Sequence, residues 1–430
     1  MPNWIRFPQT IHDTSGSNWS TFNIVPEVSV DQAKTEATNE QSCFFVYCNG
    51  EVTVDPDVFD PQTGICFKTV PLFVPESKTD LYLRELTPRN IIWVSDCPPT
   101  KEKPDNKFTP QDKELLQQST FTHAIICFFH LGLDTEKDPN NPVPQLVYNN
   151  AGDPNNSEFD TWWEYLRGLR QRNNYKTLML SVGGFGVNDW ENAKGKNGKG
   201  NEEAFATLLV NFAQSHGFAG IDFNFEGYYR NRDDLLSTLA KMVVEVRKQM
   251  RQQQWDGLFT ITPMRDNLNQ QLLAIQNAVQ IAEGRLCPLS DYVSWINVQF
   301  YKGDDPPNPD ADVADAYDQV LAGETYWGDP LSAWFPLPAK MVAAGFPLSK
   351  TDVKFNQGEL ETAKIAVQAI CPPTRPPVQA VHVRNSKHAD FAGMFVWRFR
   401  HLRADEKWLD WDGPFSKILQ IPYRHLGPGT

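Results

Sequence analysis

Three polar side chains at alternate positions mark the segment from Gly217 to Gly227. They are Asp222, Asn224 and Glu226, and they alternate with the apolar residues Ile221, Phe223 and Phe225. Strict alternation predicts a β-strand, because successive side chains of a strand point to opposite faces. Helical patterns flank the segment, so the strand should lie in a parallel sheet covered on both sides, where polar groups are costly. A glutamate that ends such a strand indicates acid–base chemistry at the carboxyl end of a barrel.

The chain from Asn90 onward supplies the elements that would hold this strand in place. The predicted strands are 91–94, 123–129, 177–184, 217–227, 258–263, 295–301, 341–347 and 392–397, and the predicted helices begin at 109 and then cover 162–169, 203–216, 232–251, 270–282 and 360–369. Eight strands with intervening helices predict an α/β protein with a (β/α)8 TIM barrel. A doubly wound open sheet is the alternative, but it requires a glycine-rich turn after an early strand, and the sequence has none.

Two connections bear on the shape of the predicted cleft. An insertion rich in proline, asparagine and aspartate is expected from Asp134 to Asn156. Between strands seven and eight, Pro347 to Ala392 covers about 45 residues, which are mostly a helix and its connections and too few for an added domain. Without a large insertion at this point, the cleft is expected to be shallow or open.

Residues 1–88 differ in pattern from the rest of the chain, and we predict a β-rich N-terminal extension or accessory module there, with the barrel domain at 89–430. The short β-rich runs are 43–47, 52–54 and 65–67. Turn signals such as Asn49-Gly50 separate them. The aromatic residues of this region fit a satellite core, with a sugar-binding platform as the alternative.

The composition is ordinary for a soluble globular protein, with 40% hydrophobic and 12% aromatic residues. A net charge of -13 argues against nucleic acid or an anionic membrane as the partner. The same charge is compatible with a neutral polymer such as a polysaccharide, and with many other ligands. No basic-then-apolar stretch opens the sequence, and no apolar run is long enough to span a bilayer. The localisation is left open, and extracellular action would require a mature form or unconventional export.

Seven cysteines are distributed unevenly along the chain. Cys43, Cys48 and Cys66 cluster near the N-terminus, where the spacing of Cys43 and Cys48 across a turn suits a disulfide. Without a recognisable export signal, buried free thiols are the preferred interpretation. No spacing of cysteine and histidine resembles a zinc site, so no metal and no cofactor is predicted.

The segment from Phe218 to Glu226 resembles the signature strand of glycoside hydrolase family 18, the chitinases and their relatives. That family carries Asp-x-x-Asp-x-Asp-x-Glu on barrel strand four. In this chain Ala219 stands at the first aspartate and Asn224 at the middle one, while Asp222 and Glu226 match the pattern.

Further motif points occur in the order that the resemblance implies. Ser181, Gly183 and Gly184 match the Ser-x-Gly-Gly of strand three, Gln299 and Tyr301 end strand six, and Trp397 ends strand eight. The Gln-x-Tyr form is more similar to the plant and fungal class III chitinases than to larger chitinases. Phe128 at the end of strand two and Met264 after strand five complete the expected substrate-binding set.

The resemblance implies a role for each of these residues. Glu226 would protonate the leaving oxygen while the substrate's own N-acetyl oxygen attacks the anomeric carbon, so no protein nucleophile is needed. Asp222 and Asn224 would orient groups around it, Gln299 and Tyr301 would contact the acetamido sugar, and Trp397 would be its platform. The implied partner is chitin or another glycan that contains N-acetylglucosamine. The plainer alternatives are a salt-bridged structural Glu226, a half-buried Tyr301 and a chance match at Trp397.

Asn224 leaves three functions open. Asparagine can accept the hydrogen bond of an acetamido N–H, but it brings no negative charge toward a cationic intermediate, and such a loss typically costs on the order of 10²–10³ in rate. The chain would then be a slow chitinase, an endo-β-N-acetylglucosaminidase or a sugar-binding relative without catalysis. We further expect the mouth around Asn224 to be walled by the side chains or the backbones of Phe223, Phe225 and Trp397, so that local charge is poorly screened.

Overall fold

The computed structural model describes the strands of the barrel, most of its helices and the short strands of the N-terminal region. The described residues are 4–7, 10–12, 23–25, 29, 31–32, 34, 44–48, 51–54, 73–75, 79–84, 89–95, 114–116, 119, 121–136, 142–148, 177–184, 188–195, 200–226, 233–300, 313–323, 337–347 and 392–397. The predicted strand at 65–67, most of the helix that begins at 109, the helices at 162–169 and 360–369, and Tyr301 lie outside them.

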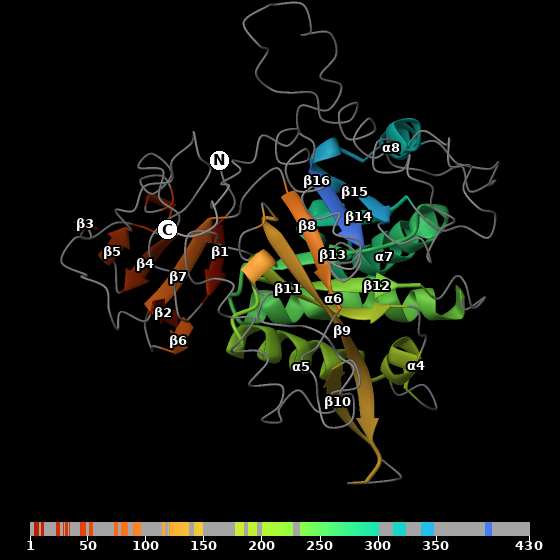
Figure 1. The fold of residues 1–430 in the computed structure, drawn as a ribbon. Coiled ribbons are helices and arrows are strands. Elements are labelled where there is room, and N and C mark those ends of the chain that lie inside the picture. The colour runs from red at the N-terminus through yellow and green to blue at the C-terminus, as the bar shows by residue number, and fades with distance from the viewer. Residues whose placement is uncertain are drawn as a thin grey trace, which may run out of the picture.

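A closed parallel barrel forms the centre of the described structure (Figure 1). Its strands are β8 (Arg89–Val94), β9 (His123–Asp134), β11 (Thr177–Gly184), β12 (Gly220–Phe225), β13 (Leu258–Ile261), β14 (Trp295–Gln299), β15 (Val342–Pro347) and β16 (Gly393–Trp397). Each pairs in parallel with the next, and β8 closes the circle by pairing with both β16 and β9. The predicted (β/α)8 TIM barrel is therefore confirmed.

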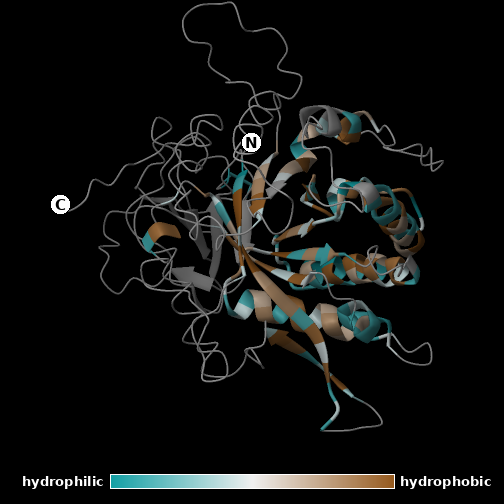
Figure 2. Ribbon diagram, turned by 45° about the vertical axis from the view of Figure 1, so that its right-hand side comes forward, coloured by the Kyte–Doolittle hydropathy of each residue, from teal (hydrophilic) through white to brown (hydrophobic). Residues whose placement is uncertain are grey.

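Helices cover the outside of this barrel. They are α4 (Asn188–Lys194), α5 (Glu202–Ser215), α6 (Leu236–Gln252), α7 (Leu268–Glu283) and α8 (Val313–Ala322). In α6 the buried residues Leu239, Val243, Val246 and Met250 recur every three or four positions, which places them on the face that packs inward. Figure 2 shows the same mixture of hydrophobic and hydrophilic residues along each helix. Among the described residues no helix has the length and apolarity needed to cross a membrane.

An antiparallel strand extends the barrel sheet next to β9. This strand, β10 (Val143–Tyr148), lies within the insertion expected from Asp134, and it pairs with the outer half of β9 from Asp134 to Phe129. In Figure 1, β9 runs well past its barrel neighbours, with β10 beside it. The composition of the insertion did not predict a strand there, because Pro144 is a residue that strands tolerate only at their edges. Leu146 and Tyr148 are nevertheless buried and anchor β10 to the core.

The N-terminal residues form β-structure, as their sequence indicates. The strands are β1 (Trp4–Phe7), β2 (Thr10–His12), β3 (Asn23–Val25), β4 (Phe44–Cys48), β5 (Glu51–Val54), β6 (Phe73–Pro75) and β7 (Thr79–Arg84). Five of them make an antiparallel sheet in the order β1-β7-β4-β5-β3, and β2 pairs with β6. Cys48 is paired with Glu51, so β4 and β5 are antiparallel neighbours, while Asn49-Gly50 between them lies outside the described residues. The boundary at 88 and the role of this region stay predictions.

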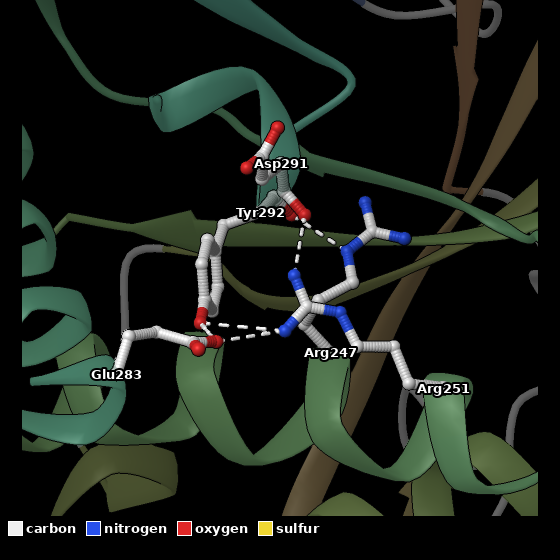
Figure 3. Close-up of polar contacts among 5 residues, drawn as sticks. All are labelled: Arg247, Arg251, Glu283, Asp291 and Tyr292. Atoms are coloured by element: carbon white, nitrogen blue, oxygen red, sulfur yellow. Dashed lines mark hydrogen bonds and ion pairs between the residues drawn. The ribbon is translucent and has the colours of Figure 1, made fainter. Parts of the chain in front are cut away.

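A group of polar contacts fastens the segments that enter β13 and β14 at their amino ends (Figure 3). Arg247 of α6 donates to the backbone carbonyls of Tyr292 at 2.9 Å and Gly257 at 3.0 Å. Arg251, one turn later, donates to Glu283 at 2.9 Å and to the carbonyl of Asp291 at 3.2 Å. The hydroxyl of Tyr292 donates to Glu283 as well. Because these contacts join α6, α7 and the approach to two strands, they fix the amino side of the barrel beneath the mouth.

Candidate active site

The polar row of β12 lies inside the barrel at its carboxyl end. Asp222 is paired with Ser181 on one side and with Thr260 on the other, and Asn224 is paired with Gly183. Asp222, Asn224 and Glu226 are only 0%, 2% and 5% exposed. Alternation along the strand therefore sets three buried polar groups one above another, with Glu226 uppermost at the mouth.

Asp222 is the deepest of the three and is held by four donated hydrogen bonds. The hydroxyl of Ser181 donates to its Oδ2 at 2.8 Å. Its Oδ1 accepts from Thr260 at 2.6 Å, from Thr262 at 2.8 Å and from Asn297 Nδ2 at 3.3 Å. Burial raises the pKa of Asp222 to about 6, while these hydrogen bonds act to lower it. A carboxylate with both oxygens occupied in this way is a fixed charge beneath the mouth.

The amide of Asn224 has one orientation that satisfies its neighbours. Gln299 Nε2 donates to the backbone carbonyl of Thr262 at 3.1 Å, and a carbonyl can only accept. The same Nε2 faces Asn224 at 3.2 Å, so the atom it meets must be the acceptor Oδ1. Asn224 Nδ2 is therefore on the other side and donates to Glu226 Oε1 at 3.1 Å. A chain of donated hydrogen bonds thus runs from Gln299 through Asn224 to Glu226.

Glu226 has one occupied and one unoccupied carboxyl oxygen. Oε1 accepts from Asn224, whereas Oε2 is buried and has no hydrogen-bond partner within the described part of the chain. The strand end that carries it is fixed from outside, because Gln271 Nε2 of α7 donates to the carbonyl of Phe225 at 3.1 Å. Buried polar atoms in native proteins are nearly always satisfied, so an orphaned carboxyl oxygen at a barrel mouth indicates a place for a ligand.

Four aromatic rings form a wall inside the barrel, next to the polar row. Trp93 of β8 lies 5.5 Å from Trp397 and 6.0 Å from Phe128, measured between ring centroids. Phe128 lies 5.8 Å from Trp397, and Phe395 lies 6.2 Å from Trp93. Trp93 is fully buried, while Phe128 and Trp397 are partly exposed. A partly exposed ring against a buried one is a surface on which a sugar face can stack.

The side chains of Phe223 and Phe225 do not line the mouth, and that part of the expectation is wrong. Both rings pack against Trp190 of α4 at centroid distances of 5.4 Å, and Phe223 also lies 5.0 Å from Phe259. They belong to the hydrophobic core between the strands and the helices. The cause is the same alternation that turns Asp222 and Asn224 inward, since a strand presents only every second residue to the barrel interior.

Two glycines at the end of β11 keep the mouth open. Gly183 and Gly184 have φ angles of +110° and +93°, which favour glycine. A Cβ at Gly183 would lie 2.2 Å from the backbone oxygen of Asn224, and one at Gly184 would lie 2.8 Å from the ring of Phe128. The Ser-x-Gly-Gly sequence therefore brings a side chain that holds Asp222 together with two positions that allow the polar row and the aromatic wall to approach.

The remaining sequence-predicted residues occupy different places. Gln299 is 2% exposed and bonded to Asn224, and Met264 is 1% exposed and bridged to Gln299 through the backbone. Tyr301 lies outside the described residues. Among those residues, no group of three histidine, cysteine, aspartate or glutamate side chains is placed to hold a metal ion.

Sequence reasoning missed four residues of this site: Trp93, Thr260, Thr262 and Asn297. Thr260 and Thr262 alternate along β13 in the same way as the row of β12, and Asn297 is two positions before Gln299 on β14. Polar residues at every second position of a buried strand were therefore the signal that would have found three of them. Trp93 is the last residue but one of β8, Trp397 ends β16, and these two strands lie side by side.

Comparison with known proteins identifies the family of this chain. The sequence profile of the glycosyl hydrolases family 18 matches residues 101–412. Among solved structures, a GH18 chitinase from Pseudoalteromonas aurantia has 16% identity and a TM-score of 0.49, with 77% of this chain and 100% of that chain covered. A family GH18 chitinase from Chromobacterium violaceum has 15% identity and a TM-score of 0.48, with 79% and 88% covered. No curated protein sequence matches the chain. Because the family profile spans most of its length, the protein belongs to glycosyl hydrolase family 18.

Proposed function

We propose that this protein is a chitinase-like glycosidase that cleaves β-1,4-linked N-acetylglucosamine in chitin and chitooligosaccharides. The observation that carries the proposal is Glu226, whose Oε1 is oriented by Asn224 and whose buried Oε2 has no hydrogen-bond partner among the described residues. A carboxyl group with one oxygen fixed and the other available is suited to transfer a proton to a bound glycosidic oxygen. The aromatic wall of Trp93, Phe128 and Trp397 supports a sugar as the ligand.

The reaction would proceed with retention and with the substrate as its own nucleophile. Protonated Glu226 gives its proton to the leaving oxygen, and the acetamido oxygen of the cleaved sugar attacks the anomeric carbon as that bond breaks. Water then opens the resulting oxazolinium ion, and Glu226 recovers a proton from that water. Only one acidic side chain is required at the cleaved bond, and Glu226 is the residue proposed for it.

The supporting residues take their proposed roles from their contacts. The carbonyl oxygen of Asn224 accepts from Gln299 and keeps a second lone pair, with which it can accept the acetamido N–H. Asp222, which Ser181 holds from below, supplies the negative charge nearest to Asn224. Trp397 stacks against the sugar, Gly183 and Gly184 give it space, and Phe128 and Met264 complete the lining. Tyr301 is proposed to reach the acetamido group from the end of strand six.

Asn224 is the reason to propose a slow enzyme. An aspartate at this position would place a negative charge beside both Glu226 and the cationic intermediate, whereas the amide places none there. Besides Glu226 itself, the nearest carboxylate named in the site is Asp222, whose two oxygens already accept hydrogen bonds from Ser181, Thr260 and Thr262. Both the oxygen and the nitrogen of the Asn224 amide are hydrogen-bonded, so the asparagine is an ordered part of the site. Because it replaces an aspartate, binding without cleavage and endo-β-N-acetylglucosaminidase activity are the competing functions.

The deciding experiment compares the wild-type protein with Glu226→Gln on two substrates, fluorogenic chitooligosaccharides and high-mannose glycopeptides. Initial rates on the chitooligosaccharides that disappear in Glu226→Gln are expected, and rates confined to the glycopeptides would assign the endoglycosidase instead. Equal background rates for both proteins would reject catalysis. Titration calorimetry with chitotetraose would then decide whether the protein is a sugar-binding relative.

A further inference from the structure

The β9–β10 hairpin presents a histidine next to the aromatic wall, and the roles assigned so far do not use it. His130 is two residues after Phe128, so both side chains lie on the same face of β9. Their rings are 6.5 Å apart between centroids, and the ring of Phe128 is in turn 5.8 Å from Trp397. Three rings in contact, Trp397, Phe128 and His130, thus lead from the aromatic wall onto the hairpin.

His130 is held in one orientation by a buried carboxylate. Its Nδ1 lies 3.1 Å from Oδ2 of Asp189 on α4, and the side chain of Asp189 is only 3% exposed while that of His130 is 38% exposed. The other oxygen of Asp189 accepts from the backbone N–H of Leu131. Asn192, also on α4, donates to the carbonyl of Leu131 at 2.7 Å. Helix α4 therefore provides hydrogen-bond partners for the N–H and the carbonyl of Leu131 in β9, and it also orients the imidazole ring of His130.

The protonation of His130 is set by this pairing. Burial acts to lower the pKa of His130, but the hydrogen bond and the negative charge of Asp189 outweigh it, so the pKa lies above its usual value. With Nδ1 directed to Asp189, the ring nitrogen Nε2 is the one left for a ligand. In the protonated ring this nitrogen donates, and a donor is what the carbonyl of an acetamido group requires.

The opposite strand places two side chains on this face, over Gly132. Val147 is paired with His130, and Gln145 with Gly132, so these side chains share the face of Phe128 and His130. A Cβ at Gly132 would lie 2.9 Å from Val147 and 3.2 Å from Gln145. Glycine at this position lets the two side chains of β10 lie flat across the hairpin. The opposite face, with Leu131 and Leu146, is buried in the core.

We propose that this face of the β9–β10 hairpin is a sugar-binding subsite, in which His130, oriented by Asp189, donates a hydrogen bond to an N-acetylhexosamine unit at least two units beyond the one that stacks on Trp397, out of reach of chitobiose. The proposal rests on the function proposed above, and it adds a residue that selects longer oligomers. His130 makes no contact with the reacting bond in this scheme, and Asp189 acts only by positioning it.

The test is the dependence of affinity on oligomer length. Titration calorimetry would compare chitobiose with chitohexaose for the wild type, His130→Ala, His130→Gln and Asp189→Asn. We expect His130→Ala to weaken chitohexaose binding by about 3- to 10-fold, the usual value of one hydrogen bond, and to leave chitobiose unchanged. His130→Gln keeps a donor on the hairpin and should recover part of the affinity. Glu136→Gln, at the exposed turn of the same hairpin, is the matched control and should bind as the wild type does.

The two proposals fail in different ways. Unchanged chitohexaose binding in His130→Ala, or equal losses for chitobiose and chitohexaose, would overturn the subsite, because the second result indicates a structural role. A wild-type protein that binds neither oligomer would overturn the proposed function and the subsite together. A thermal unfolding midpoint measured for each variant identifies any loss of folding, and His130→Gln provides the readout if His130→Ala does not fold.

Discussion

Two groups of polar side chains, one at each end of this barrel, differ in whether their hydrogen bonds are made within the described residues. At the amino end, Arg247 and Arg251 donate to three backbone carbonyls, and Glu283 receives both Arg251 and the hydroxyl of Tyr292 (Figure 3). At the carboxyl end, Oε2 of Glu226 is buried without a partner among the described residues. The polar groups named in the amino-end cluster are paired with one another, whereas Glu226 retains an acceptor unused by the described residues.

The difference separates stability from function. A buried polar group contributes to stability when it is paired and costs free energy when it is not. The amino-end cluster ties loops that have no access to the mouth, so complete pairing is its whole effect. At the mouth an unpaired carboxyl oxygen is retained at a cost, which binding of a sugar can repay. In barrels of this type, residues at the carboxyl end carry the chemistry and residues at the amino end carry the stability.

Glu226→Gln is the strongest test of the contrast between the two ends of the barrel. The amide oxygen of glutamine can still accept from Asn224, but the group has no proton to transfer, so the initial rate on chitooligosaccharides should fall by about 10²–10⁴-fold. The thermal unfolding midpoint should change little, because Oε2 has no partner to lose among the described residues. Glu203→Gln on the exposed side of α5 is the control and should leave both quantities unchanged. A rate that survives in Glu226→Gln would place the acid elsewhere.

Asn224→Asp is expected to have the next largest effect, in the opposite direction. One oxygen of the new carboxylate would still accept from Gln299, and the other would face Glu226 Oε1, which now lies 3.1 Å from Nδ2. Two carboxyl groups at this separation share a proton, so the pair would keep the proton that the leaving oxygen needs. With the added negative charge beside the cationic intermediate, the rate should rise by about 10²–10³-fold.

Two controls sharpen the Asn224→Asp result. Asn297→Asp introduces the same charge one layer deeper, next to Asp222, and should give no acceleration. Lower cleavage of glycopeptides by Asn224→Asp would indicate a site adapted to asparagine, as in an endo-β-N-acetylglucosaminidase. An unchanged rate on both substrates would contradict the electrostatic explanation of slow turnover.

The elements of the barrel were predictable from the sequence, because buried parallel strands and amphipathic helices leave local patterns. The predicted strand 177–184 has the same bounds as β11 in the structure. The predicted helix 203–216 differs from α5 by one residue at each end. The inward row of Asp222, Asn224 and Glu226 was likewise readable, since alternation alone places it.

The contacts of the row were not predictable, because they depend on register between strands that are distant in sequence. Gln299 fixes the amide of Asn224 from 75 residues away, and Asn297 reaches Asp222 over the same separation. Alternation also assigns Phe223 and Phe225 to the helix side, but the sequence did not say which aromatic residues replace them at the mouth. Helix α4, which positions His130 and packs on both phenylalanines, is only 7 residues long and too short for a periodic signal.

Asp222 offers a test of the comparison by pH. Its pKa of about 6 lies above the value of about 3.9 for an unfolded chain, so the folded protein binds the proton more tightly. The resulting stability is fully present below pH 4 and is lost as the pH rises through 6, to a total of about 3 kcal/mol. Asp222→Asn removes this dependence and can keep the same neighbours, with its Nδ2 facing the hydroxyl of Ser181.

Urea unfolding at pH 4 and pH 8 measures the effect of Asp222→Asn. The free energy of unfolding of the variant relative to that of the wild type should increase between the two pH values by up to about 3 kcal/mol. A difference that is the same at both pH values would show that Asp222 titrates equally in the folded and unfolded chain.

The smallest effects are expected from Arg247→Ala and Arg251→Ala. These two variants change only the polar cluster at the amino end of the barrel. Arg247 donates to the carbonyls of Tyr292 and Gly257, and the alanine would leave both without a side-chain donor, at a cost of about 1–3 kcal/mol in the free energy of unfolding. The side chain of Arg251 is 48% exposed, so water can replace most of its contacts, and its loss should cost no more than about 1 kcal/mol. Neither variant should change the affinity for chitohexaose, because the cluster lies at the far end of the strands from Glu226. If Arg247→Ala weakened sugar binding while the protein stayed folded, the two ends of the barrel would be coupled, and the separation of stability from function would no longer hold.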